Sequence, residues 1–404
     1  MTAILVWSGL AVAALGHGFL WTGLVNRLHG LSGPRPVIKL LTLAAFFAFL
    51  IIPPAIAWKC YRTTANEFQP FHRGDVVAGY LWLALAIGFL SLVVKPWVEA
   101  HRYDRTVLQK WTADVRDVVK LLGRKPLSGA VATILGSLPL NEALMLSVDR
   151  KRLALPRLPE ELEGLTIAHI TDLHMTGRLD REFYEVVARQ LNDLRPDVIA
   201  ITGDIIEHAA CVPWLEKTLG ALCAPLGVYF ILGNHDAFVD AGQTREILGD
   251  CGLTCLSGRW LKAEWNGVPI MLGGNELPWM SPAASLEQLT PRQPGRPEFR
   301  LVLCHTPDQF GWSVRADADL ALAGHTHGGQ IQFPILGSIM SPSLHGTRYA
   351  CGVFSRGDTV LHVSRGVSGE TPLRWRCPPE IALLELTRPQ QDDKKSSAPG
   401  SARG

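Results

Sequence analysis

The sequence is poor in charged residues. Only 19% of its 404 residues are Asp, Glu, Lys or Arg, whereas soluble domains average about 25%. The 39 basic and 37 acidic side chains almost cancel, which excludes a strongly basic nucleic-acid-binding protein. Hydrophobic residues make up 47% of the chain, too many for an intrinsically disordered protein. The eight cysteines include no C-x-x-C pair and no set at zinc-finger spacing, so we expect buried free thiols in a reducing compartment.

Several motifs of phosphoryl and acyl chemistry are also missing. No G-x-x-x-x-G-K-[ST] run is present, which excludes nucleotide-driven phosphoryl transfer through a P-loop. Residues 366–369, Gly-Val-Ser-Gly, fall short of the G-x-S-x-G elbow of serine hydrolases. There is no RNP-like or zinc-finger signature, and residues 126–404 carry 25 basic and 31 acidic groups. We therefore expect no nucleic-acid partner.

The low charge is explained by three long uncharged stretches near the N-terminus. Residues 3–25, 40–58 and 76–94 contain no Asp, Glu, Lys or Arg, and each is long enough to cross a membrane as a helix, which takes about 20 residues. Met1-Thr2-Ala3 supplies no positive charge before the first stretch. That stretch is therefore expected to be a retained span rather than a cleaved signal peptide. His17, inside it, is expected to pack as a neutral side chain in the helix interior.

The positions of Lys and Arg predict how the spans are oriented. The loop after the first span and the segment after the third span share one side of the membrane and carry seven basic residues, whereas the other side carries three. Basic loops are retained in the cytoplasm. We therefore predict an integral protein of the inner (cytoplasmic) membrane, with its N-terminus outside and all residues after 95 in the cytoplasm.

Residues 104–122 follow the third span, and their pattern predicts an amphipathic helix. The apolar residues recur at three- and four-residue spacing, and they are Val107, Trp111, Val115, Val118 and Leu122. Basic residues surround them, and the helix either lies on an anionic membrane surface or docks on the globular domain. We therefore divide the chain into a three-span region (1–100), a basic amphipathic linker (101–155), a globular domain (156–388) and a disordered tail (389–404).

From residue 165 onward, short apolar runs alternate with helical patterns. Strands are predicted at residues 165–170, 198–202, 228–232, 269–272, 301–304, 320–323, 359–363 and 381–386. Helices are predicted at residues 181–194 and near 243–248. Strands interleaved with helices are typical of a layered α/β core.

Polar residues of the kinds that bind metals follow five of these strands. The runs are Thr171-Asp172-Leu173-His174, Gly203-Asp204-Ile205-Ile206-Glu207, Gly233-Asn234-His235-Asp236, His305-Thr306-Pro307 and Gly324-His325-Thr326-His327-Gly328-Gly329-Gln330. Because ligands bind at the carboxyl ends of strands in open α/β sheets, these loops should converge, with Gly203, Gly233 and Gly324 allowing sharp turns. Carboxylate, amide and imidazole without thiolate suit divalent or trivalent first-row metals. Two such metals held close together share a bridging carboxylate.

These five runs, in this order, resemble the motifs of the calcineurin-like metallophosphoesterase family over residues 165–386. The resemblance implies a four-layer α/β/β/α metallophosphoesterase domain, preceded here by three transmembrane helices, and two metal ions of the Mn, Fe or Zn class. One metal would be bound by Asp172, His174, Asp204 and His327, and the other by Asp204, Asn234, His305 and His325. His235 would be the catalytic residue that faces the scissile phosphate, oriented by Asp236 or Asp204. Glu207 would be a surface or supporting carboxylate.

Later runs are similar to the YaeI/YkuE-type phosphodiesterases, a subgroup with membrane-associated members. The runs are Ser364-Arg365-Gly366, Arg374 and Pro378-Pro379-Glu380-Ile381. The resemblance implies hydrolysis of a phosphodiester or pyrophosphate bond by attack of a metal-bridging hydroxide. The substrate would be phosphorylated and lipid-linked, for example UDP-2,3-diacylglucosamine, and would be met at the membrane. A broad phosphodiesterase or phosphatase acting on soluble substrates and an inert membrane scaffold are the alternatives. Arg365 and Arg374 either reach a second phosphate or are ordinary surface arginines.

Overall fold

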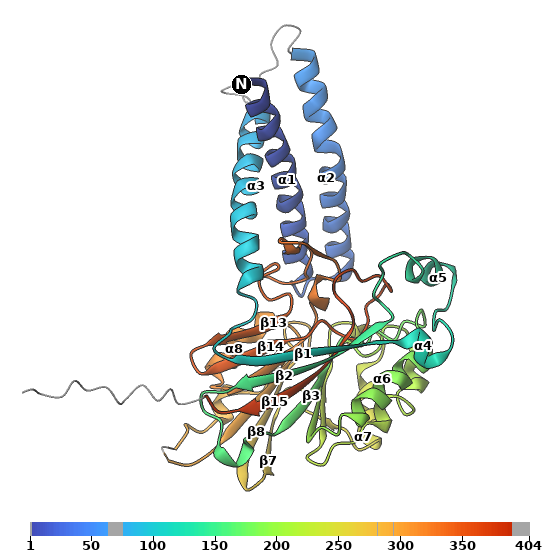
Figure 1. The fold of residues 1–404 in the computed structure, drawn as a ribbon, viewed down its shortest axis with the longest axis vertical. Helices are drawn as coiled ribbons and strands as arrows, with labels where there is room; N and C mark the ends of the chain where they lie inside the picture. Colours follow the sequence, from blue (N-terminus) through green and yellow to red (C-terminus); the bar gives the residue numbers. More distant parts are fainter. Residues whose placement is uncertain (1, 64–75, 281, 294, 390–404) are drawn as a thin grey trace, which may run out of the picture.

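Three long helices stand on one end of an α/β domain (Figure 1). The computed structural model describes residues 2–63, 76–280, 282–293 and 295–389. The disordered tail predicted for residues 389–404 lies, from residue 390 onward, outside the described residues. The predicted fold class, an α/β domain preceded by three membrane helices, is confirmed.

The membrane region consists of helices α1 (Thr2–His29), α2 (Arg35–Thr63) and α3 (Val76–Ala100). Within them, Ile4–His29, Arg35–Lys59 and Val76–Ala100 are each long and apolar enough to cross a membrane. Their exposed surfaces carry large apolar side chains, including Leu40, Phe46 and Phe89, as expected for helices that face lipid. The three predicted spans are therefore confirmed by the length and composition of these helices.

α1 and α3 pack against each other through small residues. A β-carbon on Gly16 would clash with the carbonyl oxygen of Ala84, and one on Gly88 would clash with that of Val12. Close backbone contact of this kind is typical of membrane helix pairs. His17 is buried among the helices, and its Nε2 lies 2.9 Å from the carbonyl oxygen of Phe49 in α2. The predicted interior position of this histidine is confirmed.

Two β-sheets form the centre of the domain. The larger sheet has the strand order β1-β2-β15-β3-β4-β5-β6, and the smaller has the order β13-β14-β10-β9-β8-β7. The strands of the larger sheet are β1 (Leu108–Asp117), β2 (Met145–Ala154), β15 (Glu380–Thr387), β3 (Thr166–Ile170), β4 (Val198–Thr202), β5 (Val228–Ile231) and β6 (Thr254–Cys255). Those of the smaller sheet are β13 (Gly352–Arg356), β14 (Thr359–Val363), β10 (Leu320–Ala323), β9 (Phe299–Cys304), β8 (Val268–Asn275) and β7 (Trp260–Trp265). A separate hairpin pairs β11 (Gln332–Phe333) with β12 (Gly337–Ser338).

Side chains alternate between the two faces of each central strand. In β4, Val198 and Ala200 pack between the sheets, whereas Ile199 and Ile201 pack against the helices α6 (Arg181–Asp193) and α7 (Ala241–Asp250). The outer face of the smaller sheet is covered by α8 (Phe310–Arg315) and loops. Both faces of the central strands are therefore buried, and the layers follow the predicted order α/β/β/α. β3, β4 and β5 run parallel, as do β8, β9 and β10.

The prediction of an amphipathic helix over residues 104–122 is wrong. Residues 108–117 form strand β1, which pairs antiparallel with β2, and only α4 (Val118–Leu122) is helical. β1 is an edge strand whose side chains are mostly exposed. No buried face imposes the two-residue alternation of a strand, and the spacing of its few apolar residues matched a helix instead. Because β1 and β2 lie in the larger sheet, we propose a domain that begins at Leu108 rather than after a linker.

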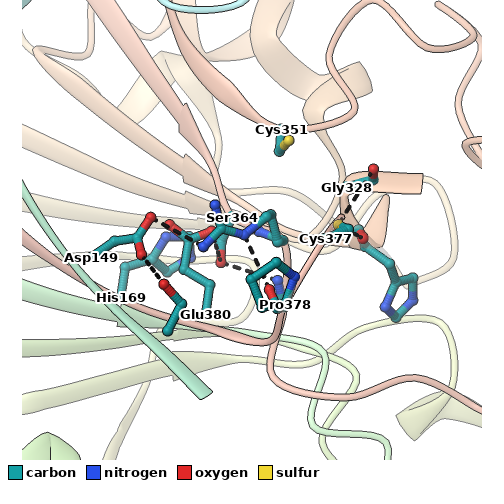
Figure 2. Close-up of polar contacts among 12 residues, drawn as sticks. Asp149, His169, Gly328, Cys351, Ser364, Cys377, Pro378 and Glu380 are labelled. Carbon is teal, nitrogen blue, oxygen red and sulfur yellow. Dashed lines mark hydrogen bonds and ion pairs between the residues drawn. The ribbon is translucent and has the colours of Figure 1, made fainter. Parts of the chain in front are cut away.

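A group of charged and polar side chains is buried between the sheets close to β2, where Figure 2 shows Asp149, His169 and Glu380. Lys151 of β2 donates to Glu380 of β15 at 2.5 Å and lies 3.0 Å from His362 of β14. His362 in turn meets His169 of β3 at 2.9 Å. Charges are rarely buried unless they are paired, and here Lys151 is paired with Glu380. The contacts of the group connect strands of both sheets.

Arg365 and Arg374 are also buried, so the expectation of surface arginines is wrong. Arg365 donates to Asp149 at 3.1 Å and to the carbonyl oxygen of Pro378 at 3.1 Å. Arg374 donates to the carbonyl oxygen of Arg365 at 2.9 Å. Their guanidinium groups are thus engaged with the domain itself.

We expect Lys151→Met to lower the free energy of unfolding by about 3–5 kcal/mol, because it leaves the buried Glu380 carboxylate without its ammonium partner. For a domain of this size, such a loss lowers the melting temperature by about 10 °C. The measurement is thermal unfolding of the purified protein in detergent, with Lys262→Met, an exposed lysine of β7, as the control. A melting temperature equal to that of the control would contradict the assignment of this pair as a structural ion pair.

Candidate metal centre

The seven predicted metal ligands lie at the carboxyl ends of strands from both sheets. Asp172 and His174 follow β3, Asp204 follows β4, Asn234 follows β5, His305 follows β9, and His325 and His327 follow β10. Five of them have a φ angle between 41° and 70°, namely Asp172, His174, Asp204, His325 and His327. Residues other than glycine seldom adopt this conformation. Backbone strain of this kind concentrates at functional sites, where the surrounding fold must maintain it.

One group of ligands is formed by the loops after β3, β4 and β10. Asp172, His174 and His327 offer ligand atoms that lie within 4.8 Å of one another. The Nε2 atom of His174 is 3.2 Å from Nε2 of His327 and 3.4 Å from Oδ2 of Asp204. These four side chains are the ones predicted for the first metal, and the structure brings them together.

The second group lies on the other side of Asp204. Asp204, His305 and His325 offer ligand atoms within 4.8 Å of one another. The Nε2 atom of His305 lies 3.2 Å from Oδ2 of Asp204 and 3.0 Å from Oδ1 of Asn234. Oδ2 of Asp204 is therefore close to imidazoles of both groups, which is the position that a bridging carboxylate needs.

Three of the four imidazoles are held in place through the ring nitrogen that faces away from the cluster. In each case Nδ1 meets an oxygen: the Thr202 carbonyl for His305 (2.8 Å), the Ser368 carbonyl for His327 (3.2 Å) and the Glu207 carboxylate for His174 (3.1 Å). These contacts fix each ring with Nε2 toward the other ligands. Metal-binding histidines are oriented by partners of this kind.

Buried atoms without partners show that the cluster fits metal ions. Among the described residues, Oδ2 of Asp204 and both ring nitrogens of His325 are buried without a hydrogen bond. Leaving such atoms unpaired is costly, and a metal ion would satisfy them. Burial and the neighbouring His305 hold the pKa of His325 well below its usual value. The ring is therefore neutral, as a metal ligand must be.

The ligand loops are tied to one another. The carboxylate of Asp236 accepts hydrogen bonds from the backbone nitrogens of Ile205 (2.9 Å), Ile206 (2.8 Å) and Gly233 (2.7 Å), which joins the loops after β4 and β5. The backbone nitrogen of His325 donates to Asp172 at 2.9 Å, which joins the two sheets. The strained ligand loops therefore support one another.

The three glycines expected to allow sharp turns serve two different purposes. Gly203 has a φ angle of 93° and does supply a turn that other residues would resist. Gly233 and Gly324 instead allow close approach. A β-carbon at Gly233 would clash with Oδ1 of Asp204, and one at Gly324 would clash with the hydroxyl of Thr171.

His235 lies at the edge of the cluster, where its Nδ1 forms an ion pair with Glu207. Its Nε2 lies 3.7 Å from the carboxylate of Glu370. Burial lowers the pKa of His235, but the charge of Asp204 and the hydrogen bond to Glu207 outweigh it and raise the pKa to about 9. The expectation that Asp236 or Asp204 orients the ring is wrong. Asp236 binds backbone amides, and Asp204 accepts from the backbone nitrogen of His235 at 2.9 Å.

Glu207 contacts the imidazoles of both His174 and His235, so of the two roles expected for it, a surface or a supporting carboxylate, the structure shows the supporting one. Burial alone would raise its pKa, but hydrogen bonds from these two histidines lower the pKa of Glu207 to about 2. The carboxylate is therefore ionised across the neutral range. It couples a predicted ligand to the predicted catalytic residue.

We expect Glu207→Gln to weaken metal binding by about 10–100-fold, because the neutral amide orients and polarises His174 less strongly than the carboxylate does. Metal titration followed by calorimetry measures the change. Glu246→Gln, at an exposed position of α7, serves as the control. Unchanged metal affinity in Glu207→Gln would mean that Glu207 supports His235 but does not affect metal binding through His174.

Trp279 is an aromatic residue of the site that the sequence did not indicate. Its ring centroid lies 4.6 Å from that of His325 and 5.7 Å from that of His305. The indole therefore packs against two histidines of the second ligand group. Its neighbours Pro278 and Met280 carry no ligand-type side chain, so the sequence offers no local signal for this contact.

Comparison with known proteins agrees with this geometry. Residues 165–329 match the calcineurin-like phosphoesterase family. The chain is 30% identical over 247 residues to the uncharacterized metallophosphoesterase YkuE of Bacillus subtilis, covering 57% of this chain and 81% of that protein. It is 27% identical over 303 residues to the UDP-2,3-diacylglucosamine pyrophosphatase LpxG of Chlamydia trachomatis, covering 60% and 90%. A transmembrane protein with metallophosphoesterase domain from Bos taurus is 30% identical over 289 residues, covering 66% of this chain and 63% of that protein.

The region that matches the family contains all seven predicted ligands and His235. The helices that precede it are long and apolar enough to span a membrane, and the relative from Bos taurus is named a transmembrane protein. The chain is therefore a membrane protein of the calcineurin-like metallophosphoesterase family and a metal-dependent phosphoester hydrolase.

Proposed function

We propose that this protein hydrolyses a phosphodiester or pyrophosphate bond of a lipid-linked substrate at the surface of the inner membrane. The position of the metal centre beside the ends of the membrane helices carries this proposal. The guanidinium of Arg35, the first residue of α2, lies 3.2 Å from the ring centroid of Phe238 in the loop that carries His235. A phosphate held at the membrane surface is therefore within reach of the site.

The two ligand groups fit two divalent or trivalent metal ions of the Mn, Fe or Zn class. Such ions would supply Lewis acidity toward the phosphoryl oxygens and a nucleophilic water molecule of lowered pKa. Asp204 would contribute to both ligand groups, since its Oδ2 lies close to imidazoles of each. His235 would face the scissile phosphate, where its imidazolium stabilises developing negative charge and protonates the leaving oxygen. The charge of Asp204 and the contact with Glu207 favour the charged form of that ring, and Glu207 also holds its Nδ1.

UDP-2,3-diacylglucosamine is the leading candidate substrate. It is the compound named for the relative LpxG, and its chemistry suits this chain. Its pyrophosphate offers oxygens that a pair of metals can clamp. Its acyl chains keep it in a bilayer, and the first residue of the membrane helix α2 contacts the loop that carries His235.

The test uses the full-length protein in phospholipid vesicles. We expect metal analysis to find two ions per chain, and lipid-linked pyrophosphates to be cleaved faster than bis(p-nitrophenyl) phosphate. Faster cleavage of the soluble diester would instead identify a broad phosphodiesterase. A chain that binds fewer than two metals and cleaves neither substrate would be an inert scaffold, and the proposal would be wrong.

The proposed orientation, with the catalytic domain in the cytoplasm, has its own test. We expect a fluorescent protein fused after Gly404 to be bright and alkaline phosphatase fused there to be inactive, because seven basic residues lie on that side against three on the other. The control is a pair of fusions after Thr63, between the second and third spans, which should give the opposite readings. Active phosphatase after Gly404 would exclude cytoplasmic nucleotide-lipids as substrates.

A further inference from the structure

Exposed apolar side chains of the domain gather in a few segments. Among the described residues after the membrane helices, most of the large exposed apolar ones fall in 131–140, in 333–344 and at one isolated position. They are Val131, Ile134, Leu138, Leu140, Phe238, Phe333, Ile335, Met340 and Leu344, and we call these nine residues the apolar collar. Leu140 and Ile335 are 78% and 76% exposed. A cluster of such side chains marks an interaction surface.

The segment 333–344 lies at the ends of two membrane helices. Asn26, near the end of α1, donates to the carbonyl oxygen of Ile339 at 3.0 Å and accepts from the backbone nitrogen of Ser341 at 2.9 Å. Lys95, near the end of α3, donates to the carbonyl oxygen of Ser338 at 2.6 Å. The collar residues on either side of these contacts are therefore fixed at the depth where the spans leave the membrane.

The other large segment of the collar begins with helix α5 (Ala130–Gly136). Ala132 faces inward, whereas Val131 and Ile134 are exposed. Figure 1 shows α5 at the level where α1 ends and α2 begins, on the α2 side of the membrane helices. The exposed apolar side chains of α5 are therefore at the level where the membrane helices meet the domain.

The collar also borders the metal centre. Asn141, just after Leu140, donates to the carbonyl oxygen of Pro372 at 2.7 Å. The same chain segment carries Glu370, whose carboxylate lies 3.7 Å from Nε2 of His235. Phe238 lies beside the same histidine, with its ring centroid 6.2 Å from that of His235. Segments that carry collar residues are thus connected to both neighbours of His235, Glu370 and Phe238.

Basic side chains accompany the collar. Arg27 of α1, Lys39 of α2 and Lys125, shortly before α5, are all exposed. Each basic residue close to a membrane surface attracts anionic lipid headgroups. An apolar surface bordered by basic residues is typical of elements that lie in the membrane interface.

We propose that the apolar collar inserts into the boundary between headgroups and acyl chains of the leaflet in which the three helices end. The metal centre then lies against the membrane, and a lipid presents its phosphate to the site from within the leaflet. The insertion follows from the positions of the collar residues alone, whereas the entry of substrate from the leaflet rests on the proposed function.

A depth measurement tests the insertion. A nitroxide is attached to Leu140→Cys or Ile335→Cys in full-length protein whose reactive cysteines are replaced by serine, in vesicles of phosphatidylethanolamine and phosphatidylglycerol. We expect both labels to be relaxed more by oxygen than by a water-soluble nickel chelate. The control label, at Val115→Cys on β1, is 49% exposed before substitution and lies outside the collar, and it should respond to the nickel chelate. Collar labels that respond like the control, or that are shielded from both reagents as by a protein partner, would overturn the proposal.

An activity measurement tests the entry of substrate. We expect Ile134→Ser combined with Leu140→Ser to lower kcat/KM on a lipid-linked pyrophosphate in vesicles at least tenfold and to leave cleavage of bis(p-nitrophenyl) phosphate unchanged. Val115→Ser should change neither rate. If the collar labels are inserted but the wild type cleaves no lipid-linked substrate, the proposed function is wrong and the insertion stands. If the wild type cleaves the lipid and the double variant cleaves it equally well, entry past the collar is wrong.

Discussion

Asp204→Asn is expected to lose both metal ions and to lower turnover by at least about 10³-fold, since metal ions supply several kcal/mol of transition-state stabilisation. The reason is that Oδ2 of Asp204 lies 3.4 Å from Nε2 of His174 in one ligand group and 3.2 Å from Nε2 of His305 in the other. The asparagine has the same size but no charge. It removes the anionic oxygen on which both groups depend.

The electrostatics of the cluster support this expectation. Burial would raise the pKa of Asp204, but the imidazoles of His305, His235 and His174 hold the pKa well below its usual value. Asp172, by contrast, has a raised pKa because of burial and the nearby charge of Asp204. Asp204 is therefore the principal negative charge at the centre of the site.

The measurement is metal content by mass spectrometry beside steady-state kinetics, on protein purified in the presence of excess Mn²⁺. Asp250→Asn, at an exposed position of α7, is the matched control and should keep wild-type metal content and turnover. If Asp204→Asn retained two ions and near-normal turnover, the assignment of the two ligand groups would be wrong.

The sequence predicted the site better than it predicted the edge of the sheet. The central strands β3, β4, β9 and β10 are buried on both faces, so each reads as a short apolar run that ends in a polar loop. Parallel strands have their carboxyl ends at the same edge of the sheet, so the convergence of the predicted ligands could be inferred from the sequence alone.

β1 and β2 lack this signal. β1 is exposed along most of its length, and β2 carries Asp149 and Lys151 on its buried face. Buried charges are uncommon because each needs a partner, and here the partners Arg365 and Glu380 come from more than 200 residues further along the chain. Nothing local in the sequence marks such pairs.

The same limit applies to the surroundings of the metal centre. Glu207 and Trp279 contact the predicted site residues only through the tertiary fold. Glu207 follows Asp204 so closely that the sequence could place it near the site, but its contact with His235 depends on how the loops after β4 and β5 meet. Spacing predicts which residues follow a strand, and packing decides which side chains touch.

His235→Asn is expected to lower kcat by about two to four orders of magnitude while leaving metal content nearly unchanged, because a proton donor contributes only in the transition state. The structure supports the separation of roles. His235 contacts Glu207 through Nδ1 and lies at the edge of the cluster, whereas His325 and His327 lie inside the two ligand groups. The loss should be smaller for an aryl phosphate than for an alkyl phosphate, because an acidic leaving group needs less protonation.

His325→Asn and His327→Asn are the matched comparison, since each replaces an imidazole in the same centre. We expect both to lower metal occupancy first and to recover part of their activity in excess metal, because a weakened site still fills at higher concentration. Metal stoichiometry and kinetics on the aryl and alkyl substrates, measured for all three variants, distinguish a ligand from a proton donor. If His235→Asn released metal as readily as the other two, His235 would join the ligands. Its imidazolium, which Asp204 and Glu207 favour, would then have no part in protonating the leaving oxygen.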